Sequence, residues 1–154
     1  MTDFDDRLAE LGLSLPAVPA PLAAYVPAVR SDGWVYTAGQ LPLRDGVLIA
    51  TGVVGGDVTV EEAFECAQQC ALNGLAAIAS VAGGLPAVAQ IVKVTGFVAG
   101  APGFTAQPQV VNGASELLGH VLGAAGVHAR SAVGVTALPM NAPVEVEIIA
   151  RLRA

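Results

Sequence analysis

The sequence predicts a single α+β domain in which a mixed β-sheet carries two helices on one of its faces. Strand-like segments rich in β-branched and aromatic residues alternate with two long segments of helical apolar periodicity, and a length of 154 residues suits one domain. The expected order of elements is β-β-(β)-α-β-α-β-β. Because both helices are expected on the same face, the other face of the sheet needs a partner.

The first part of the chain is predicted to contain an extension and a hairpin. Residues 1–13 have the pattern of a short helix, and the Pro- and Ala-rich stretch 16–21 is expected to be extended or irregular. We therefore assign 1–154 to one domain, with 1–20 as an N-terminal extension. A Ser-Asp-Gly turn between two apolar runs predicts a hairpin over 26–38.

The second part of the chain begins with a helix whose start is well marked. Thr59 and Glu62 form the pattern of a capping box, in which each residue binds the backbone NH of the other. This helix is expected to run to about Val81, where two glycines and a proline follow. The remaining elements are a third strand or extended loop, an interior strand, a second helix, a short strand and a final strand, predicted over 47–54, 88–98, 108–122, 132–135 and 144–152.

Composition and charge narrow the classes of partner. The chain is 54% hydrophobic and only 13% charged, which favours a subunit that buries surface against copies of itself. A net charge of −6 and the lack of a basic stripe argue against nucleic acid as a partner. No apolar run reaches transmembrane length, and the acidic start is unlike a signal peptide, so a cytoplasmic location is expected.

The two cysteines are expected to be structural. Cys66 and Cys70 lie four residues apart in a predicted helix, where disulfide geometry is poor. A metal site would need further ligands, and both histidines are distant in sequence. We predict small buried side chains rather than a disulfide or a metal site.

Arg130 is the first candidate for binding chemistry, because it lies at the start of a short apolar strand. A guanidinium group there can hold a planar carboxylate through two parallel hydrogen bonds. The alternative is a solvated arginine or an ion pair with Glu145 or Glu147. These two glutamates point to the same face of a strand, so their spacing cannot choose between them.

Several short motifs follow one another over residues 20–152. They are Tyr25, 36–42 (Tyr-Thr-Ala-Gly-Gln-Leu-Pro), 73–75 (Asn-Gly-Leu), 93–98 (Lys-Val-Thr-Gly-Phe-Val), Asn112, 129–131 (Ala-Arg-Ser) and 138–147. The most specific are the Gly-Gln-Leu-Pro, Ala-Arg-Ser and Leu-Pro…Val-Glu-Val-Glu pieces. Together, and in this order, the motifs resemble the RidA/YjgF family of reactive-intermediate deaminases.

The resemblance implies a chorismate-mutase-like subunit in a homotrimer, with sites in the clefts between subunits and no cofactor or metal. Arg130 would bind the substrate carboxylate. Glu145 and the backbone carbonyl of Ala132 would hold the attacking water. Tyr25 and Asn112 would line the same pocket.

Two positions depart from the family pattern. Ala38 stands where a pocket serine is common, and Ala132 stands where a cysteine is frequent. The loop 99–107 is also longer than in a typical family deaminase.

The implied activity is hydrolysis of 2-imino or 2-enamino acids to 2-oxo acids and ammonia. The alternative is a non-catalytic trimer that binds small carboxylate metabolites. Ribonuclease activity or translation inhibition, which have been attached to relatives, are disfavoured by the acidic charge.

The remaining polar and aromatic residues are expected to be incidental or structural. His128 adjoins the arginine and could serve as a base, but an incidental loop histidine is the favoured interpretation. His120 is predicted at the surface. Trp34 and Phe97 are predicted in the core, and Lys93 in an ion pair at a strand end.

Overall fold

The computed structural model describes residues 3–18 and 24–154, and its centre is a five-stranded mixed sheet. The strand order is β1-β2-β7-β5-β6, and only the β5–β6 pair is parallel. These strands are β1 (Ala28–Ser31), β2 (Trp34–Thr37), β5 (Val88–Ala99), β6 (Ala129–Val135) and β7 (Val144–Leu152). The predicted α+β class, the hairpin and the final strand are therefore confirmed.

A small separate hairpin, β3 (Leu43–Arg44) and β4 (Val47–Leu48), stands where a third strand or an extended loop was expected over 47–54. The helices are α1 (Asp3–Glu10), α2 (Val60–Ala82) and α3 (Gln107–Leu122), with three short 3₁₀ turns at Leu85–Ala87, Gly123–Gly126 and Pro139–Asn141. The expectation for 16–21 falls partly outside the described residues. Within the described residues, no helix is long and apolar enough to cross a membrane.

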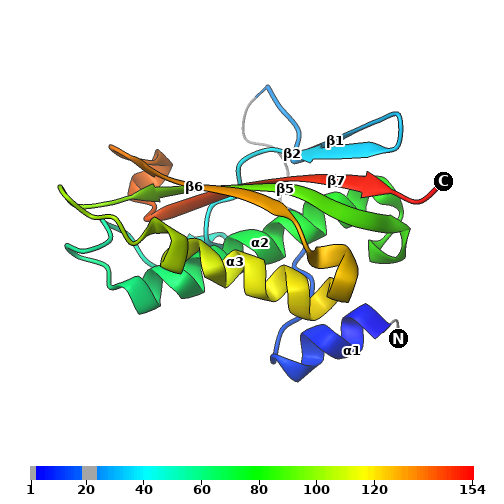
Figure 1. Ribbon diagram of the computed structural model, residues 1–154, viewed down its shortest axis with the longest axis horizontal. Coiled ribbons are helices and arrows are strands. Elements are labelled where there is room, and N and C mark those ends of the chain that lie inside the picture. Colours follow the sequence, from blue (N-terminus) through cyan, green and yellow to red (C-terminus); the bar gives the residue numbers. More distant parts are fainter. Residues whose placement is uncertain (1–2, 19–23) are drawn as a thin grey trace.

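The sheet has one covered and one uncovered face. In Figure 1, α2 and α3 lie side by side against one face, and no α-helix of the described residues lies against the other. Alternate residues of β7 from Val144 to Leu152 are buried against the helices, as the period of a strand requires. Glu145 and Glu147 therefore point to the uncovered face.

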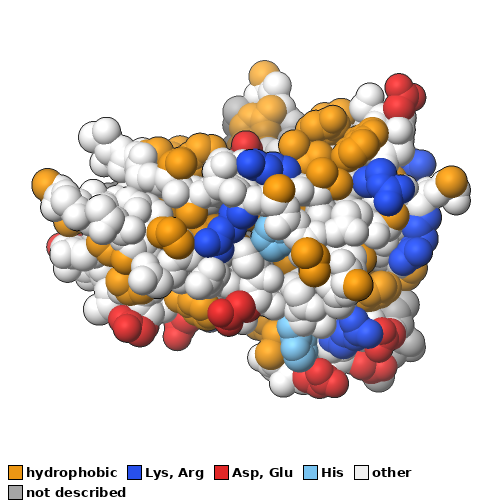
Figure 2. Space-filling view, in the orientation of Figure 1, with side chains coloured by type: hydrophobic (Ala, Val, Ile, Leu, Met, Phe, Trp, Pro, Cys, Tyr) orange, Lys and Arg blue, Asp and Glu red, His pale blue; other side chains and the backbone are white. Residues whose placement is uncertain are grey.

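Large apolar side chains remain exposed on the uncovered face. Val29 and Tyr36, which pair across the β1–β2 hairpin, are 51% and 47% exposed, and Figure 2 shows hydrophobic side chains gathered over this hairpin. Trp34 and Phe97 also lie on this face, because they alternate with the buried Val35 and Val98. The prediction that they belong to the core under the helices is wrong.

The Asn73-Gly74 pair in the middle of α2 has a clear packing role. The Asn73 side-chain amide donates to the carbonyls of Leu41 and Leu43, at 3.0 and 2.9 Å, and so ties α2 to the chain after the first hairpin. A Cβ atom on Gly74 would lie 2.7 Å from Cδ1 of Ile148. The glycine thus lets α2 lie close to β7, which outweighs its cost in helix propensity.

Helix ends behave as the sequence predicts. The capping box of α2 is present, with Thr59 accepting from the NH of Glu62 at 3.1 Å and Glu62 accepting from that of Thr59 at 2.8 Å. Gly83 ends the helix in the left-handed conformation, with φ of 86°.

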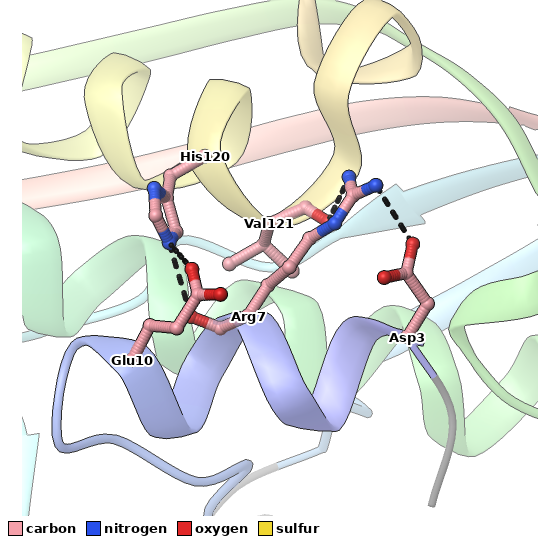
Figure 3. A network of polar contacts seen from close by, with 5 residues as sticks. All are labelled: Asp3, Arg7, Glu10, His120 and Val121. Carbon is pink, nitrogen blue, oxygen red and sulfur yellow. Dashed lines mark hydrogen bonds and ion pairs between the residues drawn. The ribbon is translucent and has the colours of Figure 1, made fainter.

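Helix α1 is attached to the end of α3 by a cluster of polar contacts (Figure 3). Arg7 donates to the carbonyl of Val121 at 3.3 Å and pairs with Asp3 at 2.7 Å. His120 Nε2 lies 3.1 Å from the carbonyl of Arg7 and 3.1 Å from the carboxylate of Glu10. His120 is exposed, as predicted, and Leu8 of α1 is completely buried in the core.

Cys66 and Cys70 are unpaired and buried on α2, as predicted. Burial raises the pKa of the Cys66 thiol to about 11, with further contributions from Glu65 and Glu62. Burial also raises the pKa of Cys70. Neither thiol is therefore a nucleophile at neutral pH.

Candidate active site

Arg130 projects toward the helices from β6, which is an edge strand of the sheet. It pairs with the buried Val94 of β5, so its side chain lies on the covered face. Its Nη1 donates to Oδ1 of Asn112 at 2.8 Å and to Oγ of Ser115 at 3.2 Å, and its Nη2 donates to the carbonyl of Pro108 at 3.3 Å. Three contacts with α3 therefore fix the plane of the guanidinium group.

The remaining donors of Arg130 are suited to a carboxylate. Of the five guanidinium N–H groups, three bind α3. Among residues 3–18 and 24–154, nothing accepts a hydrogen bond from Nε or from the second N–H of Nη2. These two nitrogens are neighbours in the guanidinium plane, as a bidentate carboxylate requires. No ion pair forms between Arg130 and either glutamate within the described chain, so that alternative is not seen here.

His128 and Ser115 form a second layer around Arg130. The Ser115 hydroxyl lies 2.9 Å from Nε2 of His128, and Nδ1 of His128 lies 2.6 Å from the carbonyl of Gly126. The histidine is therefore built into the structure around Arg130 and is not an incidental loop residue.

Glu145 occupies a confined position on the uncovered face. Its carboxylate lies directly over Gly39, where a Cβ atom would overlap it. Burial raises the pKa of the Glu145 carboxyl, and the charge of Glu147 raises it further. Glu147 itself is exposed. Both glutamates lie on one face, as predicted, but only Glu145 has the confined surroundings of a functional carboxylate.

The single chain brings together only some of the predicted site residues. Arg130 and Asn112 are in contact, but Arg130 lies on the covered face and Glu145 on the uncovered face, with β5 between their strands. Tyr25 is 58% exposed and precedes β1, at the opposite edge of the sheet from Arg130.

The two predicted alanines have different surroundings. Ala38 donates its NH to the carbonyl of Pro27 at 2.8 Å and follows β2, also on the side of the sheet away from Arg130. Ala132 lies beside Arg130 on β6, pairs with Gly96 and packs its methyl group against the core. The carbonyl of Ala132 is thus on the same strand as Arg130.

Neither of the two best-formed hollows on the described surface includes Arg130 or Glu145. One, of about 200 Å³, lies between α2, α3 and Leu11, and the other, of about 220 Å³, lies beside Arg44 and the segment 12–16.

Lys93 donates to Oγ of Ser131 at 3.1 Å in mid-strand, so its predicted ion pair at a strand end is wrong. Within the described residues, no group of three His, Cys, Asp or Glu side chains could hold a metal ion.

The residues that sequence reasoning missed are Ser115 and Gly39. Ser115 follows Asn112 by three positions, so both lie on one face of α3, and His128 precedes Arg130 by two, so both lie on one face of the chain entering β6. Both spacings can be recognised in the sequence alone. The role of Gly39 depends on the long-range approach of β7, which no local pattern reveals.

Known proteins share this fold over nearly the whole chain. The protein Atu1372 from Agrobacterium tumefaciens superposes with a TM-score of 0.91, at 44% identity, covering 98% of this chain and 93% of that one. The YjgF gene product of Escherichia coli gives a TM-score of 0.66 at 28% identity, covering 88% and 94%. Protein TCP17 of Trypanosoma cruzi is 42% identical over 147 residues, or 95% of this chain and 92% of that protein.

The fold and these likenesses define a small α+β protein of the YjgF type. The family described as Endoribonuclease L-PSP matches residues 16–152, and the chain belongs to this family, the YjgF/RidA family. The predicted resemblance is thereby confirmed. Helix α1 lies outside the matched residues.

Proposed function

We propose that the protein hydrolyses 2-imino or 2-enamino acids to 2-oxo acids and ammonia, in clefts formed between copies of the chain. The observation that carries this proposal is the state of Arg130. Its guanidinium group is held by α3 through Nη1 and Nη2, while Nε and one N–H of Nη2 remain for a carboxylate.

A bound carboxylate fixes the adjacent carbon of the substrate. In a 2-imino acid, C2 carries the C=N bond and is attached directly to the carboxylate carbon, so two hydrogen bonds to Arg130 also orient C2. The imine is attacked by water at C2, the new C–O bond forms, and the C=N electron pair moves to nitrogen. Protonation of nitrogen and cleavage of the C–N bond then release ammonia and leave the 2-oxo acid.

Glu145 is our proposed group for holding and deprotonating the water. A carboxyl whose pKa is raised toward the working pH is suited to accept a proton and return it to the leaving nitrogen. The carbonyl of Ala132 is the proposed second acceptor for the water, and Tyr25 and Ala38 are proposed pocket walls.

These groups require a second copy of the chain. Arg130 and Glu145 lie on different faces of one sheet, and Tyr25 and Ala38 lie toward the far edge. We propose a homotrimer whose uncovered sheet faces pack together, which would bury Val29 and Tyr36 and bring one chain's Arg130 to a neighbour's open face.

The test is ammonia release from imino acids generated in solution by an amino-acid oxidase. We expect wild type to accelerate release, and Arg130→Ala and Glu145→Gln to lose that acceleration by at least about 100-fold. Arg153→Ala is the matched control, since Arg153 is an exposed arginine whose side chain, within the described part of the chain, donates to the backbone carbonyl of Pro86. Carboxylate binding without turnover would indicate the non-catalytic binding protein instead.

A further inference from the structure

A line of hydrogen bonds leads from the backbone of Gly126 to the guanidinium group of Arg130. Its members are the carbonyl of Gly126, the imidazole of His128, the hydroxyl of Ser115 and Nη1 of Arg130. Successive contacts measure 2.6, 2.9 and 3.2 Å. Ser115 lies on α3, His128 lies just before β6, and Arg130 lies on β6.

Hydrogen-bonding chemistry fixes the direction of this line. A carbonyl only accepts, so Nδ1 of His128 carries the proton shared with Gly126, and arginine only donates, so Oγ of Ser115 accepts from Arg130. In the tautomer with its proton on Nδ1, Nε2 of His128 is an acceptor, and the one hydroxyl hydrogen of Ser115 is donated to it.

Without Nε2 of His128 as an acceptor, the hydroxyl of Ser115 would donate its hydrogen to a different nearby group. Serine in a helix readily donates to the carbonyl four residues earlier, which reorients its lone pairs. His128 prevents this by accepting the hydroxyl hydrogen, so a lone pair of Ser115 remains directed at Arg130. Ser115 and Asn112 then occupy both hydrogens of Nη1.

We propose that Ser115 and His128 are positioning residues that determine which edge of Arg130 faces the substrate. Because Nη1 is fully occupied, the guanidinium group presents its Nε–Nη2 edge, the pair that holds a single carboxylate. This inference rests on the proposed function in one respect, namely that Arg130 binds the substrate carboxylate.

The backbone is shaped to bring the histidine to the helix. Gly126 is buried, and a Cβ atom there would overlap the carbonyl of Leu118 in α3. Only glycine allows the chain to pass this close to α3 just before His128. The close approach therefore places the imidazole within hydrogen-bond distance of Ser115.

Binding of 2-oxobutanoate by titration calorimetry tests this proposal. We expect His128→Leu and Ser115→Ala each to raise the dissociation constant by about 3- to 10-fold, which is the loss of affinity typical of one hydrogen bond. The double variant should lose no more than either single variant, because both act through one contact. His128→Gln, whose Oε1 can accept from Ser115, should recover most of the affinity.

His120→Gln is the matched control, since His120 lies on α3 but, among the described residues, its side chain makes its polar contacts with α1. If wild type binds 2-oxobutanoate, Arg130→Ala does not, and His128→Leu binds as wild type does, the inference is overturned while the proposed function stands. If wild type does not bind the carboxylate at all, the proposed function fails.

Nitrogen NMR of the imidazole provides a measurement that is independent of activity. Long-range ¹H–¹⁵N correlations should show His128 of the wild type with its proton on Nδ1 and an unprotonated Nε2. In Ser115→Ala, the Nε2 resonance should shift, because its hydrogen-bond donor is gone. A wild-type His128 protonated on Nε2, or one unaffected by Ser115→Ala, contradicts the inference.

Discussion

The carboxylate of Glu145 occupies the space that a side chain on Gly39 would need. A Cβ atom at position 39 would overlap Oε1 of Glu145. Gly39 follows Ala38, and the next residue, Gln40, pairs with Val146 of β7 through two backbone hydrogen bonds of 2.8 and 3.0 Å. The backbone around Gly39 is thus held against β7, so the glutamate would have to move.

Gly39→Ala should therefore displace Glu145 and reduce turnover by at least about 10-fold, with little effect on carboxylate binding, because the guanidinium group of Arg130 is held by α3 and not by Gly39 or Glu145. Steady-state kinetics and 2-oxobutanoate titration would separate the two effects. Gly119→Ala is the control, since a Cβ atom there meets nothing within 4 Å. Unchanged turnover in Gly39→Ala would show that the position of Glu145 is unimportant.

Glu145 should also make stability depend on pH. Because its pKa is raised in the folded chain, the folded state retains a proton that the unfolded state has released just above pH 4.5. The free energy of unfolding should therefore decrease as pH rises through this window. Glu145→Gln should remove that decrease and become progressively more stable than wild type.

Urea unfolding at a fixed protein concentration, repeated between pH 4 and 8, would measure this difference. Glu65→Gln, which changes an exposed glutamate on α2, serves as the comparison. Parallel curves for wild type and Glu145→Gln would contradict the raised pKa.

The two cysteines should react slowly with alkylating agents in the folded protein. With a pKa of about 11 for Cys66, roughly one thiol in a thousand is ionised at pH 8, and Cys70 is more deeply buried. Iodoacetamide labelling followed by mass spectrometry should be much slower in buffer than in urea. Rapid labelling of the folded protein would mean that α2 opens locally.

Leu8 should contribute most of the energy that attaches α1 to the domain. Leu8→Ala removes a completely buried side chain and should lower the free energy of unfolding by about 2–5 kcal/mol. Leu11→Ala is the matched control, because Leu11 is 40% exposed. Glu10→Gln alters an exposed ion pair and should change stability by less than about 1 kcal/mol.

Urea unfolding would compare these three variants, and 2-oxobutanoate titration would examine the site. Carboxylate binding by Leu8→Ala should match wild type, since α1 holds the end of α3 at Val121, away from Asn112. Weaker binding would show that the attachment of α1 is coupled to the site.

The helices and strands were predicted well because the signals for them lie within short segments of the sequence. The capping box at Thr59, the glycine at the end of α2 and the alternation of β7 each depend on a few neighbouring residues. The face occupied by Trp34 and Phe97 could not be predicted in the same way. Alternation shows that two sets of side chains point in opposite directions, but not which set the helices cover.

The candidate site was predicted unevenly for the same reason. Arg130 and Asn112 came from a motif resemblance, and the structure places them in contact. The positions of Ser115 and His128 follow from simple spacing once α3 and β6 are known. The approach of Glu145 to Gly39 joins segments more than 100 residues apart, and only the folded sheet reveals it.

The groups that hold the guanidinium of Arg130 all come from one continuous stretch of the chain, from Pro108 to Arg130. Glu145 and Gly39 come from elsewhere. If Arg130 binds the substrate carboxylate as proposed, carboxylate recognition can therefore be inherited as a unit while the proposed hydrolytic half of the site diverges. Gene duplication of such a protein could produce a sensor of 2-oxo acids from an enzyme by changes confined to Glu145 and its surroundings, with no change in the stretch that recognises the ligand.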